Sequence, residues 1–290
     1  MSLAALGMDG VPALDPLSYP GRLVDEPELL CGAGLLPMVP SREPMGRWRV
    51  NDGASDAQTL DEALVALDLP PAGERHPVIA VGSNGAPGQL HHKLSRLGLP
   101  AVVPMTPLRV SGLGVGVSAH VGLNGYVANS PFLDPECTAD VVLTLLDSDQ
   151  LRAVDDTELP RYRRVLLPAA DLPMVLPSGE HLDAAYLYVN ATGVLAGSDG
   201  TPLHPGPQAA LLAELLDRSP RLRELFDSPQ DWVTKARADA NLRAAAKRIF
   251  HDEGWVLPQD AWHHSPSDDP GTTSVSYAEL SPLATGRDHP

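Results

Sequence analysis

Cysteine, lysine and aromatic residues are all scarce in this sequence of 290 residues, which has two cysteines, three lysines and 4% aromatic residues. Cys31 and Cys137 form neither a CxxC motif nor a paired framework, so we expect reduced thiols and a cytoplasmic location. No apolar run reaches the ~18 residues that span a bilayer, and the first residues lack the basic region of a signal peptide. The shortage of lysine, beside abundant alanine, glycine and proline, is typical of a GC-rich bacterial genome.

Positive charge is scarce as well, because 21 lysines and arginines stand against 37 acidic residues, for a net charge of −16. An average field of this sign repels a phosphate backbone. It repels an anionic membrane surface for the same reason. The sequence therefore predicts neither a nucleic acid nor a membrane as a partner.

Proline, in contrast, is abundant, at 30 residues. Because proline stops helices and cannot donate within a sheet, we expect much loop and edge structure. No repeat occurs at any period, which excludes solenoids and coiled coils. The composition predicts four parts, which are a Pro/Gly-rich N-terminal arm (1–57), a mixed domain (58–205), a C-terminal helical extension (206–262) and a disordered tail (263–290).

Helix and strand patterns follow one another through the mixed domain. Thr59 and Glu62 fit a capping box before a short helix, and Asp147 and Gln150 fit the start of another. Residues 99–146 combine β-like runs with many glycines, which are typical of the bends in a closed or strongly curved sheet. Further strands are predicted at 162–167 and 184–189, and helices at 208–216 and from Ser228 to Gly254.

A predicted buried strand runs directly into a glycine-containing turn and a helix. Residues 78–81 are an apolar run, and residues 88–97 have a helical pattern. The turn between them consists of Gly82, Ser83, Asn84 and Gly85. Such a turn directs backbone N–H groups toward one point, which can bind a carboxylate, a phosphate or a developing oxyanion. Its spacing matches neither GxGxxG nor a P-loop, so the alternative is a plain strand–helix connection rather than a nucleotide site.

Glu158 lies on the apolar stripe of a helix predicted over residues 148–158. It follows Leu151 and Val154 at i+7 and i+4, so its carboxylate continues their stripe. A carboxylate on the buried side either pairs with a cation or has its pKa raised by desolvation, which suits a general acid or base. The alternative is a structural ion pair with one of the arginines that follow, which are Arg161, Arg163 and Arg164.

The remaining titratable and nucleophilic residues show no pattern that supports catalysis. Asp155 and Asp156 lie on the flanking faces of the same helix, and we expect both to be solvated. Ser83 is not in the GxSxG motif of a serine hydrolase. Neither HExxH nor a zinc-binding spacing occurs among the histidines considered, which are His91, His92, His120, His263 and His264. We therefore expect no bound metal, and a metal hydrolase is the weakest of the alternatives.

Two segments together resemble the gamma-glutamylcyclotransferase-like family. The family has a strand followed by Y-G-S-N and a helix, and residues 81–84 here read VGSN. The family then has a strand, a helix containing L-D-x-x-E, and a strand that starts with Y-x-R. The similar stretch here, residues 145–165, reads LLDSDQLRAVDDTELPRYRRV. The resemblance covers roughly residues 77–190 and leaves out the arm and the C-terminal helices.

The resemblance implies an α+β fold, with a small mixed β-barrel surrounded by helices and flanked by the arm and the helical extension. It also implies an enzyme that cleaves a γ-glutamyl amide, in which the α-amine attacks the γ-carbonyl and releases 5-oxoproline and an amine. Glu158 takes the position of the family's general acid and base. Gly82, Ser83 and Asn84 take the position of the turn that holds the glutamyl group through N–H donors. No metal or organic cofactor is implied.

Val81 departs from the family, which usually has tyrosine at this position. We expect another tyrosine to replace it, with Tyr126, Tyr186 and Tyr188 as the candidates. The departure leaves hydrolysis open, and it also leaves open a second class of protein, a non-catalytic small-molecule binding or scaffold protein on the same fold. The segments outside the resemblance are expected to recognise the amine portion of the substrate.

Overall fold

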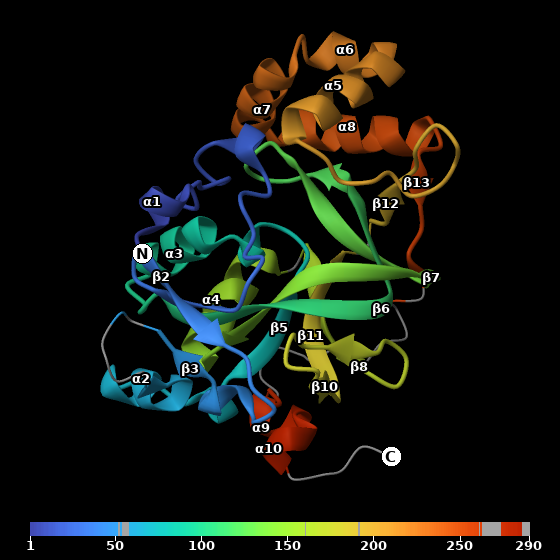
Figure 1. Cartoon of the computed structure of the whole chain (residues 1–290). Coiled ribbons are helices and arrows are strands. Elements are labelled where there is room, and N and C mark those ends of the chain that lie inside the picture. Colours follow the sequence, from blue (N-terminus) through green and yellow to red (C-terminus); the bar gives the residue numbers. More distant parts are fainter. Residues whose placement is uncertain are drawn as a thin grey trace.

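One long antiparallel ribbon forms the centre of the chain in its computed structural model (Figure 1). The structure describes residues 1–51, 53, 58–159, 161–190, 192–260, 262 and 274–285. The ribbon consists of β6 (Val102–Val121) and β7 (Val127–Leu146). Its register shifts beside Gly112, which has a positive φ of 79°. Glycine adopts that conformation at little cost, so this predicted bend is present and it interrupts the regular pairing.

The ribbon belongs to a larger sheet with the order β4-β3-β2-β1-β6-β7-β5-β11-β8. β5 and β11 pair in parallel, and the other neighbours along this path are antiparallel. Together with the helices, this sheet confirms the predicted combination of α and β structure. The strands besides β6 and β7 are β1 (Glu28–Cys31), β2 (Gly34–Val39), β3 (Arg49–Val50), β4 (Gln58–Thr59), β5 (His76–Ala80), β8 (Tyr162–Pro168) and β11 (Ala184–Asn190).

Within the described residues the sheet is open, so the prediction of a small closed barrel is wrong. β4 and β8 lie at its two ends and do not pair with each other. The outer edge of β6 is already occupied by β1, β9 (Met174–Val175) and β12 (Val194–Leu195). The N-terminal strands therefore extend the sheet beyond β6 instead of leaving that edge to close on β8. Two further short strands pair with these, β10 (His181–Leu182) with β9 and β13 (Val256–Leu257) with β12.

Successive residues of β5 face opposite sides of the sheet, as the pleat of a strand requires. Val78 lies in one apolar core together with α3 (Pro87–Arg96) and α4 (Ser148–Glu158). Ile79 lies in the other core together with α2 (Leu60–Ala66). The capping boxes predicted at the starts of α2 and α4 are both present. β5 and the two helices α3 and α4 therefore converge on one side of the sheet.

Helices of the C-terminal segment, of which the one over residues 220–225 was not predicted, pack on the far end of the ribbon (Figure 1). Apolar side chains from β6, β7 and these helices form a separate core, in which Trp232 is fully buried. Asp239 ends one helix and caps the next by accepting from Asn241 N, so the long helix predicted after Ser228 is divided into two. The helices are α5 (Gln208–Arg218), α6 (Pro220–Leu225), α7 (Pro229–Ala238) and α8 (Ala240–Asp252).

Both ends of the chain contribute ordered structure to this arrangement. The arm predicted over 1–57 begins with α1 (Leu3–Leu6) and supplies β1, β2 and β3 to the sheet. Residues 274–285, which belong to the tail predicted to be disordered, instead form α9 (Tyr277–Leu280) and α10 (Pro282–Thr285), because Tyr277 is buried against the domain. The rest of that tail, 263–273 and 286–290, lies outside the described residues. The division into four parts stays a prediction.

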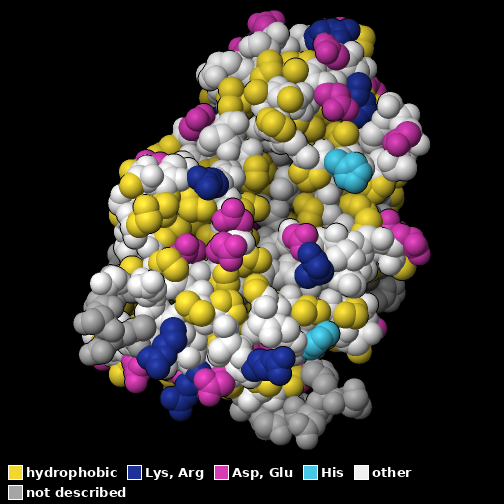
Figure 2. Space-filling view, viewed as in Figure 1, with side chains coloured by type: hydrophobic (Ala, Val, Ile, Leu, Met, Phe, Trp, Pro, Cys, Tyr) yellow, Lys and Arg dark blue, Asp and Glu magenta, His cyan; other side chains and the backbone are white. Residues whose placement is uncertain are grey.

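None of the helices in the described part of the chain is long and apolar enough to cross a membrane. Figure 2 shows lysine and arginine side chains interspersed with acidic ones over one face of the molecule. A groove that tracks a phosphate backbone needs basic side chains gathered on one face, which this view does not show. The absence of a nucleic-acid partner stays a prediction.

Candidate functional site

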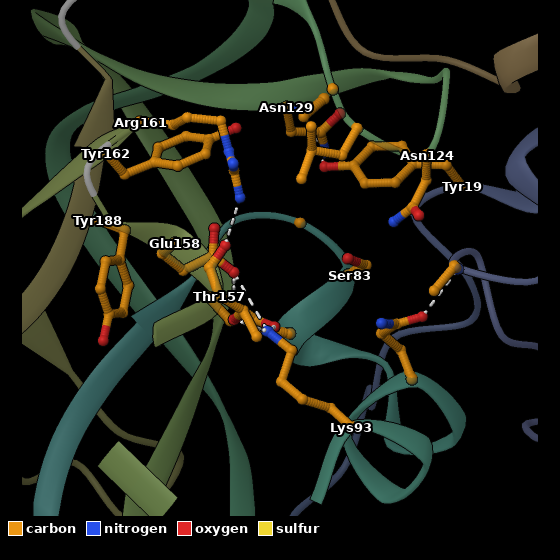
Figure 3. A pocket seen from close by; sticks show the side chains of 18 of the residues that line it. Tyr19, Ser83, Lys93, Asn124, Asn129, Thr157, Glu158, Arg161, Tyr162 and Tyr188 are labelled. Atoms are coloured by element: carbon orange, nitrogen blue, oxygen red, sulfur yellow. Dashed lines mark hydrogen bonds and ion pairs between the residues drawn. The ribbon is translucent and has the colours of Figure 1, made fainter. Parts of the chain in front are cut away.

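A pocket of about 620 Å³ lies where the end of β5 meets α3 and α4. The predicted turn forms part of its wall through residues 82–84, and so does Glu158 at the end of α4. The connection between β6 and β7 contributes Tyr126, and the N-terminal arm contributes Tyr19. Figure 3 shows Tyr19, Ser83 and Glu158 around this pocket, together with Lys93 from α3. Segments far apart in the sequence therefore build one site.

The turn after β5 is a single turn of 3-10 helix, η4 (Ser83–Gly85). Two N–H groups, those of Gly85 and Ala86, donate to carbonyl oxygens of the turn at 2.9 and 3.0 Å. The amides of Ser83 and Asn84 are not used within the turn, and that of Ser83 already interacts with the hydroxyl of Tyr19. A ligand oxygen at this point of the pocket could accept from the backbone, and anion binding by the turn stays a prediction.

The two glycines of the turn have different surroundings. Gly82 lines the pocket, and a Cβ there would collide with the hydroxyl of Tyr19. Gly85 packs on the sheet instead of lining the pocket, since a Cβ there would lie 3.1 Å from Val142. The absence of a side chain at Gly82 thus lets Tyr19 of the arm approach the turn. The absence of a side chain at Gly85 lets the turn pack closely on β7.

Glu158 is hydrogen-bonded directly to the turn. Its Oε1 accepts from Asn84 Nδ2 at 3.1 Å and from Lys93 Nζ at 3.2 Å. Lys93 also donates to Asn84 Oδ1 and to Thr157 Oγ1, both at 2.8 Å. The side chain of Glu158 is 19% exposed and that of Lys93 is 10% exposed, so the ion pair is largely shielded from water. Two predicted site residues that are 74 positions apart are therefore in contact.

The cation beside Glu158 comes from α3 and not from the arginines considered for this role. Arg161 donates to the backbone oxygen of Thr157 at 2.7 Å. Arg164 pairs with Asp155 at 3.2 Å. The side chain of Glu158 thus forms the ion pair foreseen for a carboxylate on a buried stripe, but with a residue of another helix.

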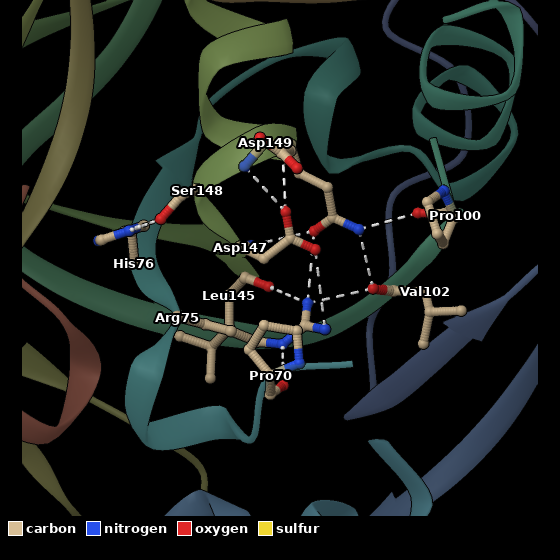
Figure 4. A network of polar contacts seen from close by, with 10 residues as sticks. Pro70, Arg75, His76, Pro100, Val102, Leu145, Asp147, Ser148 and Asp149 are labelled. Carbon is tan, nitrogen blue, oxygen red and sulfur yellow. Dashed lines mark hydrogen bonds and ion pairs between the residues drawn. The ribbon is translucent and has the colours of Figure 1, made fainter. Parts of the chain in front are cut away.

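A buried polar network holds the start of α4 (Figure 4). Arg75 is fully buried, and its Nη1 donates to the carbonyl oxygens of Val102 and Leu145 at 3.2 and 3.3 Å. The same nitrogen donates to Gln150 Oε1 at 3.3 Å, and Nη2 lies 4.0 Å from Asp147, the N-cap of α4. Burial lowers the pKa of Arg75 to about 10, so the guanidinium stays charged at neutral pH.

A second buried ion pair holds the other end of α4. Asp155 pairs with Arg164 at 3.2 Å and accepts from the hydroxyl of Tyr188 at 2.6 Å. The expectation that Asp155 is solvated is wrong, because β8 and β11 place these two partners against it and leave it 8% exposed. Glu158 follows one helical turn later, so the pair at Asp155 fixes the direction in which α4 presents its last carboxylate.

Four of the six tyrosines line the pocket, which are Tyr19, Tyr126, Tyr162 and Tyr188. Of the three tyrosines predicted to replace the one missing at Val81, Tyr126 and Tyr188 therefore reach the site. Tyr186 does not line it: it lies two residues before Tyr188 on the same face of β11, and its hydroxyl accepts from Val275 N at 2.7 Å. Burial raises the pKa of Tyr126 and of Tyr162 above the ordinary phenol value. These phenols are therefore neutral donors and acceptors at neutral pH.

His120 also lines the pocket, as a neutral imidazole. Burial lowers its pKa to about 4, and the ring contacts the edge of Tyr162 with centroids 5.7 Å apart. Its Nδ1 is in close contact with the hydroxyl of Ser118. In the part of the chain that the structure describes, no group of three or more His, Cys, Asp or Glu side chains could hold a metal ion. His263 and His264 lie outside the described residues.

Lys93 and Tyr19 belong to this site, although no pattern in the sequence selected them. Lys93 is one of only three lysines and lies in the helix that follows the turn, nine positions after Asn84. That isolated lysine on a predicted helix is the one signal that would have pointed to it. Tyr19 lies in the arm, 110 positions from Asn129, to which its hydroxyl is bonded, and no local periodicity connects the two.

The pocket combines a carboxylate, an ammonium group and backbone N–H donors. Within the described residues both hydrogen bonds of Glu158 use Oε1, so Oε2 is the oxygen left there for a proton or for a cationic ligand group. The amides of Ser83 and Asn84 suit an anionic or carbonyl oxygen. A ligand that carries an ammonium group close to a carboxylate or carbonyl group matches this set of partners.

No family model and no curated protein matches this chain. Some solved structures are similar to part of it. A gamma-glutamyl cyclotransferase is 12% identical, with 69% of this chain and 94% of that protein covered and a TM-score of 0.33. Two Arabidopsis thaliana proteins solved in solution are 18% and 16% identical, cover 40% and 50% of this chain, and have TM-scores of 0.30 and 0.34. The matches span 61% and 85% of those two proteins, so the first is matched over less than two thirds of its length.

Proposed function

We propose that the pocket binds a γ-glutamyl amide and releases 5-oxoproline and an amine by intramolecular cyclotransfer. The α-amine nitrogen attacks the γ-carbonyl carbon of the same glutamyl group, and the amide C–N bond breaks. The leaving amine gains the proton that the attacking amine loses, so no water is consumed. One observation carries the proposal, which is the hydrogen bond between Asn84 of the turn and Glu158 of α4 on the wall of one pocket.

In this proposal Glu158 transfers the proton. Its Oε2 accepts a proton from the α-ammonium group and returns one to the leaving nitrogen, while Oε1 stays bonded to Asn84 and Lys93. General acid–base help of this kind contributes roughly 10²–10⁴-fold to the rate. Ring closure within one bound molecule supplies much of the remaining acceleration, because both reacting atoms are already held together. The reaction needs no metal or organic cofactor.

The turn would hold the glutamyl group against Glu158. The amides of Ser83 and Asn84 donate to the α-carboxylate or polarise the γ-carbonyl oxygen on which charge develops. The amine portion would extend toward the tyrosines and the β6–β7 connection, which also line the pocket. A cytoplasmic location belongs to the same proposal, and it is supported by the free thiols of Cys31 and Cys137.

A second candidate is a binding protein without turnover on the same pocket. The ion pair between Lys93 and Glu158 favours it, because this carboxylate already binds a partner that orders the pocket without any ligand. On this reading Glu158 orders the pocket and takes no proton. The two candidates differ in what the charge of Glu158 does, since only the enzyme needs a titratable group there.

Mass spectrometry of reaction products tests the choice. Purified protein is incubated with γ-glutamyl amines, γ-glutamyl amino acids and glutathione, beside Glu158→Gln and, as a matched control, Glu224→Gln on the exposed face of α6. We expect 5-oxoproline from the wild type and from Glu224→Gln, and a loss of at least 100-fold in Glu158→Gln with its fold intact. Free glutamate in place of 5-oxoproline would indicate hydrolysis. Ligand-induced stabilisation without any product, equal in wild type and Glu158→Gln, would favour the binding protein.

A further inference from the structure

Tyr19 is a side chain of the N-terminal arm that lies directly on the turn (Figure 3). Its hydroxyl accepts from the backbone N–H of Asn129 at 2.8 Å. The same hydroxyl occupies the space that a side chain at Gly82 would take. Val81, the residue before Gly82, carries no polar group. The arm thus brings a phenol to a point where the strand itself offers only apolar side chains.

Several contacts hold this phenol in one place. The Tyr19 ring stacks on Tyr126 with centroids 4.3 Å apart and an interplanar angle of 25°. Earlier in the arm, Ala13 N donates to Gln89 Oε1 on α3 at 3.0 Å, which ties the arm to the helix after the turn. Tyr19 is only 5% exposed, yet it is part of the pocket wall. Its hydroxyl is therefore preorganised at the pocket before any ligand binds.

The hydroxyl of Tyr19 still has its own proton to donate. A phenol oxygen accepts hydrogen bonds and donates its single proton. The oxygen of Tyr19 accepts from Asn129, and no acceptor for its proton is present among the described residues. Burial raises the pKa of Tyr19, whereas the amides of Asn129 and Ser83 act in the opposite direction with a smaller effect. The phenol therefore keeps its proton at neutral pH and can donate it into the pocket.

We propose that Tyr19 is a substrate-binding residue, which donates its O–H to the carboxylate or carbonyl oxygen that the ligand places at Ser83 and Asn84. The arm then completes the pocket, and its phenol joins the backbone donors of the turn. This inference rests on the proposed function for the identity of the ligand. Tyr19 then takes the place of the tyrosine that is missing at Val81. It is not one of the three replacements predicted from the sequence.

Tyr19→Phe tests the inference, because it removes the donor and keeps the ring that stacks on Tyr126. We expect kcat/KM for the best γ-glutamyl amide to fall about tenfold or more, as the loss of one buried hydrogen bond to a ligand predicts. The thermal midpoint should change far less than activity. Tyr186→Phe is the matched control, since it removes the same atom from a buried tyrosine outside the pocket, and its kcat/KM should equal that of the wild type.

The outcomes separate this inference from the proposed function. An unchanged kcat/KM in Tyr19→Phe, with or without a lower thermal midpoint, would show a structural role only and overturn the inference. If the wild type releases no product, the proposed reaction fails, and calorimetry with 5-oxoproline and L-glutamate as probes replaces kinetics. A tenfold weaker affinity of Tyr19→Phe then supports the donor role, and equal affinity overturns it. Binding of neither probe by the wild type would overturn both proposals.

Discussion

Glu158 shares one carboxylate oxygen between donors from two different elements, Asn84 of the turn and Lys93 of α3. An exposed ion pair contributes little to stability because water screens it. This pair is largely shielded, so removing one partner leaves a charge with few other contacts. The pair therefore links the folding of the pocket to the residue that we propose transfers the proton.

A double-mutant cycle on Lys93 and Glu158 tests this link. We expect Lys93→Met to lower the free energy of unfolding by about 1–3 kcal/mol, because it leaves the Glu158 carboxylate without its cation. The double variant with Glu158→Gln should lose less than the sum of the single losses, with a coupling of about 1 kcal/mol. Urea unfolding of the four proteins measures both quantities.

The exposed pair of Lys235 and Asp231 on α7 is the matched control for that cycle, since the lysine is 41% exposed. Its coupling should not exceed about 0.5 kcal/mol. Equal coupling at the two sites, or strictly additive losses at Lys93 and Glu158, would mean that the pocket pair is as weak as a surface pair.

Residues that act within a short run of sequence could be predicted at this site, and residues brought in by docking could not. The turn and Glu158 were both recognisable, because a strand followed by glycine and a carboxylate on an apolar stripe are local patterns. Lys93 meets Glu158 across 65 positions and Tyr19 meets Asn129 across 110 positions. These contacts depend on how α3 and the arm pack, which no periodicity specifies.

At the scale of the element, α4 is held at both ends by buried charges. Arg75 holds the N-terminal end together with Asp147 and Gln150, and Arg164 holds the C-terminal end through Asp155. The cap at Asp147 could be predicted, because it is a contact between residues three positions apart. The arginines could not, since they come from neighbouring strands and loops of the folded sheet. The helix is thus recognisable from its sequence, while its orientation comes from the rest of the fold.

Arg75→Met tests the anchoring of this helix. We expect a loss of about 3–5 kcal/mol in the free energy of unfolding, because Asp147 and several carbonyl oxygens lose a buried donor. Arg109→Met is the control, since Arg109 pairs with Asp140 on the surface with a side chain that is 66% exposed. The control should lose no more than about 1 kcal/mol in the same urea experiment. Similar losses in the two variants would show that the buried network contributes no more than a surface pair.

At the scale of the whole molecule, the outer segments of the chain are tied into one body. The closed barrel was a wrong prediction because strands of the arm take the edge of β6, and their pairing partners are remote in sequence. The C-terminal segment is tied in by Tyr277, whose hydroxyl donates to the Glu180 carboxylate within 3.0 Å and accepts from Met45 N at 3.0 Å. Ser281 also contacts this carboxylate. Three distant segments therefore meet at one buried acid.

Glu180 makes the stability of this junction depend on pH, and the direction of its pKa shift fixes the sign. Burial raises the pKa of its carboxyl group, and the hydrogen bonds from Ser281 and Tyr277 lower it by less. The folded state therefore binds this proton more tightly than the unfolded state does. It follows that the stabilisation is complete below the ordinary carboxyl pKa, and that it is lost as pH rises through the raised value. Glu180→Gln keeps a neutral side chain of the same shape and removes this titration.

We therefore expect the free energies of unfolding of wild type and Glu180→Gln to diverge as pH rises from about 4 to 8, with the wild type losing stability relative to the variant. Urea unfolding followed by tryptophan fluorescence at several pH values measures the difference. Glu224→Gln on α6 is the control, because its carboxylate is exposed and its curve should run parallel to that of the wild type. If the curve of Glu180→Gln is also parallel, the carboxyl group titrates alike in the folded and unfolded states. The docking of the C-terminal segment is then independent of pH in this range.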